Sequence, residues 1–502
     1  MKVLLVNPPA ENVRSGNPDE EQFLDTKDFG LFPPLGLLYV YSYLEAHSQG
    51  HELHFHDCVG EKLSHQDLRL ILRQIKPDIV GVTSFTVSLI DVIEVARMVR
   101  EESPQAHICM GGHHPIAFPI EAAQTKEFDS IIVGEGEYAF TDLVRAIESG
   151  GDITQIEGVY TAKSILPYIG QPMAQDRRFL QSVMVPPAYV DNLDDLPPPN
   201  RKLIRQINYH STVGVSGNLA TIITTRGCPY LCAFCDVPYK KYRQRSVDLV
   251  LDEVQQCLDM GYDEFHFYDD LFNVNPRKVI EFCDAVERRG MKFAWDFRGR
   301  VNAVTRESLE RAKRAGLRQI SFGVETGTNE GLDYLKKGTN VQQIRDAFRW
   351  CRELGIRTVA DYILGFPFEK SADDVRRNID FLIDLDPDYA LFSILQLLPN
   401  TALYREAVAK GLVKDGSWEA FSANPSLDFK VEHWTEHLSL AELIALRREA
   451  YRKLYLRPSY ILRNILQTRT PHEFMLKFRG FLLLLGGVAS SMRHRLLTSN
   501  RA

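Results

Sequence analysis

The chain has 502 residues and a formal net charge of -7, with 44% hydrophobic and 25% charged residues. A length of ~150 residues per domain indicates about three structural units, and these fractions exclude a disordered, collagen-like or porin-like protein. The acidic balance also excludes a globally basic nucleic-acid binder, so we expect no nucleic-acid partner.

The first 150 residues alternate short β-rich runs with helical patterns, as a parallel sheet covered by helices does. We therefore expect residues 1–150 to form a doubly wound, Rossmann-like α/β domain. Five strands are predicted at 2–7, 52–57, 78–84, 106–110 and 129–133, and four helices at 35–47, 68–75, 89–101 and 137–149.

Residues 151–218 lose this alternation and carry proline runs at 186–187 and 197–199. Because proline disfavours both helix and strand, we expect a connector here. A second alternating series over 219–398 indicates a partial (βα)6 TIM-like barrel, with ligands at the carboxyl ends of its strands. Its strands are predicted at 219–225, 264–269, 291–297, 318–324, 357–364 and 389–396, and its helices at 247–260, 276–289, 306–315, 341–354 and 372–385.

The last part, 399–502, has a mainly helical pattern and a basic end. Residues 447–502 contain twelve Lys or Arg and two Glu. Within them the apolar stretch 481–488 has Lys477 and Arg479 before it and Arg493 and Arg495 after it. Such a segment can lie in the headgroup region of an anionic membrane. A helix that packs its leucines on the barrel gives the same pattern.

The N-terminus and the cysteine content indicate the compartment. Residues 1–9 hold four consecutive apolar residues, too few for a secretory signal. The longest apolar stretch, 481–489, is shorter than the ~20 residues that a transmembrane helix needs. Eight cysteines are too sparse for a disulfide scaffold. We therefore expect a cytoplasmic protein, with peripheral membrane contact as an option for its tail.

Three of the cysteines cluster directly after the first strand of the second series. Cys228, Cys232 and Cys235 follow one another with three and then two residues between them. Three thiolates on one short loop can hold three irons of a cubane [4Fe–4S] cluster and leave the fourth iron free. The alternatives are a zinc site that lacks its fourth ligand and three unligated thiols.

With this motif after the first barrel strand, residues 219–396 resemble the radical S-adenosylmethionine (radical SAM) superfamily. The resemblance implies that Cys228, Cys232 and Cys235 ligate a [4Fe–4S] cluster whose open iron binds the amino and carboxylate groups of S-adenosylmethionine. An electron from that cluster then cleaves the sulfonium carbon–sulfur bond and yields a 5'-deoxyadenosyl radical. The implied partner is a low-potential electron donor such as flavodoxin or ferredoxin.

Further segments lie where later strands end, as the superfamily's contacts to S-adenosylmethionine do. The resemblance implies that Asp269 or Asp270 contacts the methionine ammonium and that Arg300 contacts its carboxylate. It places Glu325 near the ribose hydroxyls and Gly365 near the adenine, where glycine allows close backbone approach. Each aspartate taken singly would equally suit a helix cap.

The first domain resembles the cobalamin-binding domain of the cobalamin-dependent branch of this superfamily. Small residues follow its strands: Ser84 after the third, Gly111 and Gly112 after the fourth, and Gly134 with Glu135 after the fifth. In that fold the nucleotide tail of cobalamin passes between strand ends, where small residues leave room. Each glycine taken singly would also fit an ordinary turn.

One departure concerns the lower ligand of cobalt. Cobalamin domains with a histidine ligand carry Asp-x-His-x-x-Gly after the second strand, whereas here Asp57 is followed by Val59 and Lys62 at the His and Gly positions. We therefore do not expect a lower histidine ligand. His113 and His114 are expected to support the site or face solvent rather than bind cobalt.

The resemblance implies a cobalamin-dependent radical SAM enzyme, and we expect a methyltransferase acting on an unactivated carbon of a small-molecule or lipid-like substrate. The alternative is a radical oxidative cyclase or rearrangement enzyme that resembles the anaerobic magnesium-protoporphyrin ester cyclase. A tRNA methylthiotransferase is more remote, because Cys58 and Cys109 are too few for a second cluster. A non-enzymatic cobalamin sensor is disfavoured by the barrel and its three cysteines.

Overall fold

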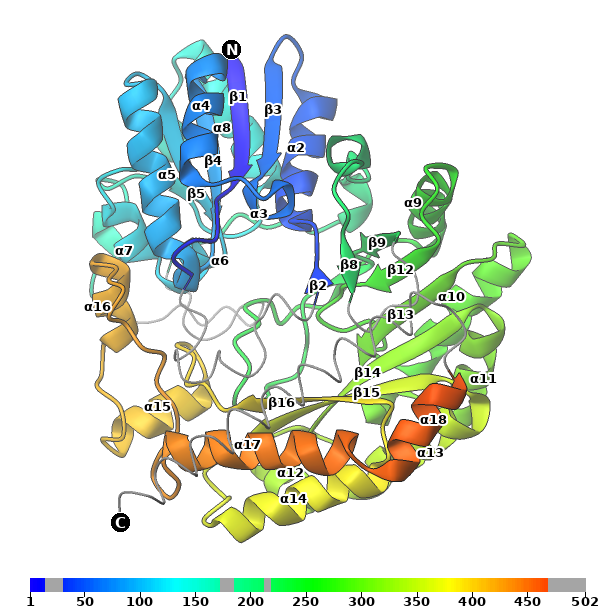
Figure 1. Ribbon diagram of the computed structural model, residues 1–502. Helices are drawn as coiled ribbons and strands as arrows, with labels where there is room; N and C mark the ends of the chain where they lie inside the picture. The colour runs from blue at the N-terminus through cyan, green and yellow to red at the C-terminus, as the bar shows by residue number, and fades with distance from the viewer. Residues whose placement is uncertain (14–29, 172–184, 212–217, 468–502) are drawn as a thin grey trace.

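The computed structural model describes residues 1–13, 30–171, 185–211 and 218–467. Two sheets lie in separate α/β units, and the helices of the C-terminal region pack beside both of them (Figure 1). The predicted fold class, a Rossmann-like unit followed by a partial barrel and a mainly helical end, is confirmed.

The first sheet has the strand order β3-β1-β4-β5-β6-β7, in which the first five strands run parallel and β7 antiparallel. Val3 and Leu5 of β1 pack on one side of the sheet and Leu4 and Val6 on the other. Both faces are thus covered by helices, which is why β1 is apolar at successive positions. The strands are β1 (Lys2–Asn7), β3 (Glu52–Asp57), β4 (Ile79–Ser84), β5 (His107–Gly112), β6 (Ser130–Ile132) and β7 (Val159–Tyr160), and the main helices are α2 (Leu35–His47), α4 (His65–Ile75), α5 (Leu89–Glu102) and α8 (Gly136–Ser149).

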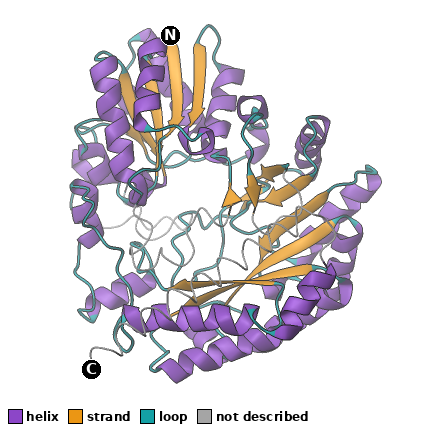
Figure 2. Ribbon diagram, viewed as in Figure 1, coloured by secondary structure: helices purple, strands orange, loops and turns teal. Residues whose placement is uncertain are grey.

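The second sheet has six parallel strands in the order β9-β12-β13-β14-β15-β16. Its two end strands are β9 and β16, so the barrel is partial, as Figure 2 shows. Trp295 and Phe297 of β13 are buried against the helices, whereas Arg298 of the same strand is exposed. The strands are β9 (Leu219–Ile222), β12 (Glu264–Phe267), β13 (Ala294–Gly299), β14 (Leu317–Glu325), β15 (Arg357–Leu364) and β16 (Tyr389–Ile394), and the helices are α9 (Val247–Asp259), α10 (Pro276–Arg288), α11 (Arg306–Arg314), α13 (Val341–Leu354) and α14 (Ala372–Leu385).

The segment between the sheets joins both units. Its strand β7 extends the first sheet, an addition that the alternation pattern did not predict. Tyr209 donates a hydrogen bond to Asp57 Oδ2 of the first unit at 2.5 Å, and Arg201 pairs with Glu253 of α9 at 2.8 Å.

The shorter elements of the whole chain are β2 (Gly30–Leu31), α3 (Cys58–Glu61), η2 (Thr86–Ser88), α6 (His113–Ala117), α7 (Pro119–Gln124), η3 (Ile153–Gln155), η4 (Leu166–Tyr168), η5 (Leu193–Asp195), η6 (Arg201–Ile204), β8 (His210–Ser211), β10 (Thr225–Arg226), β11 (Arg243–Gln244), η7 (Val301–Ala303) and α12 (Asn329–Tyr334).

The C-terminal region consists of α15 (Ala402–Ala409), α16 (Ser417–Ala423), α17 (Leu440–Tyr455) and α18 (Pro458–Gln467). Leu403 and Trp418 share one core with Phe118 of the first unit and Ala233 of the barrel. This region therefore closes one side of the boundary between the units. Within the described ranges no helix is long and apolar enough to cross a membrane. The basic tail with Lys477 and Arg493 lies outside them.

Candidate functional site

The carboxyl ends of the two sheets face each other across the boundary between the units (Figure 2). His113 directly follows β5, and Asp270 follows β12; burial raises the pKa of the Asp270 carboxyl, and the nearby His113 acts in the opposite direction. Ile116 of the first unit packs on Tyr239 of the barrel. Groups that follow strands of both sheets therefore meet in one region, as α/β folds require of a shared site.

The three predicted ligand cysteines lie on a loop, residues 227–242, that we call the cysteine loop. A two-stranded antiparallel ladder of β10 and β11 closes its base. Backbone hydrogen bonds hold its interior, from Cys228 N to Tyr239 O at 2.9 Å and from Ala233 N to Leu335 O at 2.9 Å. Gly227 has φ +84°, and an added Cβ would lie 2.5 Å from Lys241 O, so the turn requires glycine.

The donor set of this loop fits an iron–sulfur cluster. Cys228, Cys232 and Cys235 are all free and partly exposed. Burial raises the pKa of the Cys228 thiol, and that of Cys235 to about 11, so a bound cation is needed to keep these thiols ionised. In the described part of the chain, no three His, Cys, Asp or Glu side chains converge on a single ion. The thiolates of a cubane site bind three different irons, so three cysteines spread along one loop suit such a cluster.

Arg300 and Glu325, predicted from separate strands, belong to one network beside the cysteine loop. Arg300 Nη1 lies 3.7 Å from Cys232 Sγ, and its guanidinium lies 3.6 Å from the centre of the Tyr230 ring. Its Nη2 donates to the carbonyl of Lys337, whose Nζ pairs with Glu325 Oε1 at 2.6 Å. The structure therefore brings both predicted contacts of S-adenosylmethionine to one side of the cysteines.

Two features of this network were not predicted. Lys337 follows the short helix α12, and its neighbours in sequence carry no signal for a site. Glu325 has φ +65°, a left-handed backbone that is uncommon for a residue with a side chain. Such backbones cost of order 1–3 kcal/mol and gather at functional sites.

The adjacent aspartates have different surroundings. Asp269 is buried and accepts hydrogen bonds from Thr224 N at 2.7 Å, Thr224 Oγ1 at 2.5 Å and Thr225 N at 2.9 Å. Burial raises its pKa to about 6. Asp270 accepts from Gly227 N at 3.1 Å and is otherwise exposed. Asp269 thus joins the ends of β9 and β12, whereas Asp270 is the exposed aspartate of the two.

Gly365 has φ +86°, and an added Cβ would lie 2.8 Å from Leu443 of α17. The left-handed backbone thus favours glycine there, and Leu443 of the C-terminal region packs against it. Glu369, which was not predicted, accepts from Gly365 N at 2.7 Å and from Asn378 Nδ2 at 2.7 Å. Burial raises the pKa of Glu369 to about 7. In the sequence, the sign of this contact was an acidic residue, Glu369, four positions after the loop glycine Gly365.

The first sheet offers a cradle of small residues, which fits the predicted cobalamin tail. Ser84 and Gly112 pair across β4 and β5, and Ser84 Oγ donates to Gly111 O at 2.7 Å. An added Cβ on Gly111 would meet nothing within 4 Å, whereas one on Gly112 would lie 2.6 Å from Ser84 O. Open space therefore borders Gly111, and close backbone contact requires Gly112.

Gly134 and Glu135, predicted for the same site, contact other parts of the protein. Gly134 forms a bridge with Ala188, whose carbonyl would lie 2.2 Å from an added Cβ. Glu135 accepts from Val190 N at 2.7 Å and forms ion pairs with Arg226 and Arg243 of the ladder under the cysteine loop. Their role in binding cobalamin stays a prediction.

Asp57, His113 and His114, which were considered for the lower side of cobalt, have partners within the chain. Asp57 accepts from Asn7 Nδ2 at 2.7 Å and from Tyr209, and α3 starts at the next residue. His114 is fully buried with Nδ1 3.1 Å from Thr86 Oγ1, and burial lowers its pKa to about 3. His113 stacks against the exposed ring of Phe85 at 6.0 Å.

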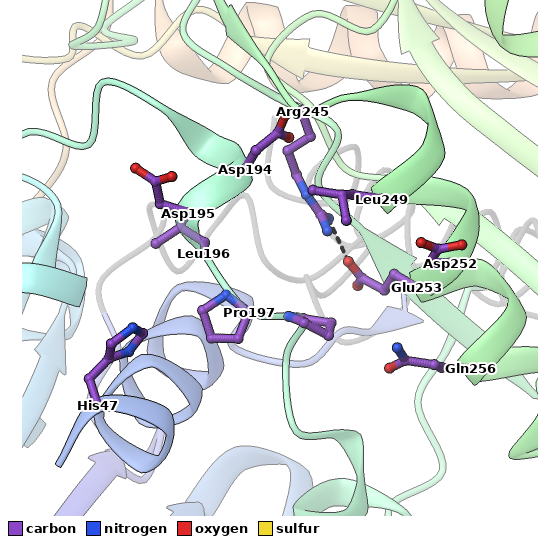
Figure 3. Close-up of a pocket in the computed structure, with 11 residues that line it drawn as sticks. His47, Asp194, Asp195, Leu196, Pro197, Arg245, Leu249, Asp252, Glu253 and Gln256 are labelled. Carbon is purple, nitrogen blue, oxygen red and sulfur yellow. Dashed lines mark hydrogen bonds and ion pairs between the residues drawn. The ribbon is translucent and has the colours of Figure 1, made fainter.

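A pocket of about 330 Å³ opens elsewhere, between the connector, α2 and α9 (Figure 3). Asp194, Asp195 and Asp252 line it, and Arg245 reaches it while paired with Glu253. None of the predicted cofactor residues lines this pocket. We assign it no part in the chemistry.

Comparisons with known proteins identify the families of the two units. Residues 222–382 match the family model of the radical SAM superfamily, and residues 24–144 match that of the B12 binding domain. The chain is 28% identical over 489 residues to the uncharacterized methyltransferase PH0819 of Pyrococcus horikoshii, covering 96% of this chain and 98% of that one. It is 30% identical over 391 residues to an anaerobic magnesium-protoporphyrin IX monomethyl ester cyclase of Cereibacter sphaeroides, covering 75% of this chain and 60% of the cyclase.

A solved structure has the same architecture. The cobalamin-dependent S-adenosylmethionine radical enzyme OxsB, with aqua-cobalamin and S-adenosylmethionine bound, superposes with a TM-score of 0.69 at 18% identity. The match covers 96% of this chain and 72% of OxsB. At this identity the similarity establishes the fold.

Proposed function

The chain belongs to the cobalamin-dependent radical SAM enzymes, as its motifs predicted, and from this premise we propose that it transfers a methyl group to an unactivated carbon of a small-molecule substrate. Its cofactors are a [4Fe–4S] cluster, S-adenosylmethionine and cobalamin. When bound, the cluster with S-adenosylmethionine supplies hydrogen-atom abstraction, and cobalamin supplies the methyl group.

The observation that carries this proposal is that the carboxyl ends of the two sheets meet at one boundary. Cys228, Cys232 and Cys235 would hold the cluster, with Arg300 beside Cys232 as a positive neighbour. The space next to Gly111 would take the tail of cobalamin. Ile116, in the helix that follows β5, packs on Tyr239 of the cysteine loop, so the two sites lie at one boundary.

The residues of the chain then position the reactants and exclude water. Lys337 offers an ammonium and Glu325 a carboxylate, suited to the carboxylate and hydroxyl groups of S-adenosylmethionine. Leu403 and Trp418, in the core that also holds Ala233, close the C-terminal side of the cysteine loop. Closure of this kind prevents side reactions of radicals with water.

Methyl transfer is favoured because PH0819, which bears a methyltransferase name, aligns with nearly the whole chain. Oxidative cyclisation is the second candidate, because a cyclase reaches 30% identity. A low-potential electron donor such as flavodoxin or ferredoxin is the proposed partner. A lipid-like substrate and contact of the tail 468–502 with a membrane are further proposals, and the tail lies outside the described residues.

The test is anaerobic reconstitution with iron, sulfide and cobalamin, followed by incubation with cell extract and methyl-labelled S-adenosylmethionine. Mass spectrometry should find a small molecule that gains one labelled methyl group. A product that loses hydrogens without gaining label would establish the cyclase instead. Consumption of S-adenosylmethionine without any new product would contradict both.

A further inference from the structure

Two arginines occupy the same rung of the ladder that closes the cysteine loop. Arg226 of β10 pairs directly with Arg243 of β11. Side chains at directly opposite positions of an antiparallel pair lie on the same face, and like charges there repel. The base of the cysteine loop therefore needs a negative group from outside the ladder.

The first unit supplies that group. Arg226 Nη1 lies 3.1 Å from Glu135 Oε1, while Arg243 donates to both oxygens of Glu135, at 2.7 Å and 2.9 Å. Arg226 Nη2 also lies 2.6 Å from Glu137 Oε1. Two guanidinium groups thus meet two carboxylates, and we call Glu135, Glu137, Arg226 and Arg243 the interdomain clamp.

The interdomain clamp is buried and rigidly supported. Its side chains are 3% to 14% exposed. Arg243 lies 3.9 Å from the centre of the Tyr189 ring, and Arg226 lies 5.3 Å from that of Tyr39. Burial acts to raise the pKa of Glu135, but Arg226 and Arg243 hold it below its ordinary value. Bidentate pairs of this kind fix orientation as well as distance.

Both ends of the interdomain clamp belong to cofactor sites. Glu135 follows β6, which pairs with β5, the strand that ends at Gly112. Arg226 and Arg243 flank residues 227–242, which carry the three cysteines. We propose that the interdomain clamp is a positioning device that fixes the cysteine loop relative to the cobalamin-binding edge. Its catalytic consequence rests on the proposed function, but its effect on the loop does not.

The main variant is Glu135→Gln, which keeps the shape of the side chain and removes its charge. The matched control is Arg201→Gln, because the Arg201–Glu253 pair is equally buried and joins the connector to α9. Hydrogen–deuterium exchange of the full-length chain should show about tenfold faster exchange at 227–242 in Glu135→Gln. The control should leave exchange at 227–242 unchanged.

A second readout measures the cofactor geometry directly. In reconstituted protein, the magnetic coupling between the reduced cluster and cob(II)alamin reports the distance between them. Glu135→Gln should broaden that distance distribution while iron and cobalamin contents stay at wild-type levels. Turnover should fall by about tenfold to 100-fold, because small displacements of reacting groups cost that much.

Equal exchange at 227–242 and equal magnetic coupling in wild type and Glu135→Gln would overturn the proposal. The same effects in Arg201→Gln would also overturn it, since they would show only a general loss of stability. Should Glu135→Gln fail to fold, Arg243→Lys keeps the charge but loses the bidentate contact, and it should give a smaller change in the same direction. A wild type that makes no product would refute the proposed function and leave the exchange comparison intact.

Discussion

The proposed cobalamin-binding edge, at Ser84, Gly111 and Gly112, consists of small residues and backbone, whereas the proposed cluster edge, at Arg300, Glu325 and Lys337, consists of charged side chains that hold one another. A site made of empty space is sensitive to added volume. A site made of paired charges is sensitive to the loss of one partner. The two edges should therefore respond to different substitutions, and each prediction below uses that difference.

The largest effect is expected at the cysteine loop. Replacing Cys228, Cys232 or Cys235 with alanine should abolish the broad iron–sulfur absorbance and all turnover, because a cubane needs three protein thiolates here. Iron analysis after anaerobic reconstitution measures this. Cys351→Ala, at a buried core cysteine, is the control and should retain iron. Unchanged iron in the triple variant would disprove the cluster assignment.

At the cobalamin-binding edge, Gly111→Leu should weaken cobalamin binding about 100-fold, because its side chain would enter the open space beside Ser84. Iron content should stay normal. Titration followed by absorbance gives the affinity. Gly36→Leu also meets open space, lies on α2 and should bind cobalamin normally. Equal affinity in both variants would show that the tail lies elsewhere.

At the cluster edge, Lys337→Met should cost about 3 kcal/mol of stability, because it leaves the Glu325 carboxylate buried without its partner. The double variant Lys337→Met/Glu325→Gln should recover most of that stability but bind S-adenosylmethionine no better than the single variant. Urea unfolding and equilibrium dialysis measure the two quantities. Recovery of binding in the double variant would mean that the pair serves stability alone.

The two edges should also differ in how pH affects stability. Burial raises the pKa of Glu369 to about 7, so its contribution is complete below its ordinary value of 4.5 and is lost as pH rises to 7. Burial lowers the pKa of His114 to about 3, so its contribution is complete above 6.5 and is lost as pH falls toward 3.

Between pH 4.5 and 6.5, Glu369→Gln should therefore make stability rise more steeply with pH, and His114→Gln less steeply. Each change should approach about 1.4 kcal/mol per pH unit. Urea unfolding at several pH values, with wild type in parallel, provides the measurement. Slopes that change in the same direction would contradict the opposite protonation assigned to the two residues.

The smallest effect concerns the basic tail, which belongs to neither edge. If its basic residues lie at a membrane surface, each contributes about 1 kcal/mol of binding to anionic lipid. Full-length protein should then sediment with anionic vesicles more than a chain that ends near Thr470. Equal sedimentation would leave packing on the barrel as the explanation of the apolar stretch.

Local sequence determined most of the main helices and strands and the three-cysteine motif of this protein. The helix predicted at 341–354 is α13 (Val341–Leu354), because Asn340 caps its start and Gly355 takes the left-handed conformation at its end. The cysteine motif was equally accessible, since its three cysteines lie within eight residues. Signals of this kind involve neighbours in the chain, which contact one another whatever the rest of the fold does.

Only the tertiary structure separated residues that look alike in sequence. Gly111 borders open space while Gly134 is enclosed by Ala188, although both are glycines at or just after the carboxyl ends of strands of one sheet. Glu135 follows one of those strands too, but Arg243, 108 residues away, takes its carboxylate. Which partner fills the space beside a residue depends on how distant elements pack, and neither periodicity nor spacing carries that information.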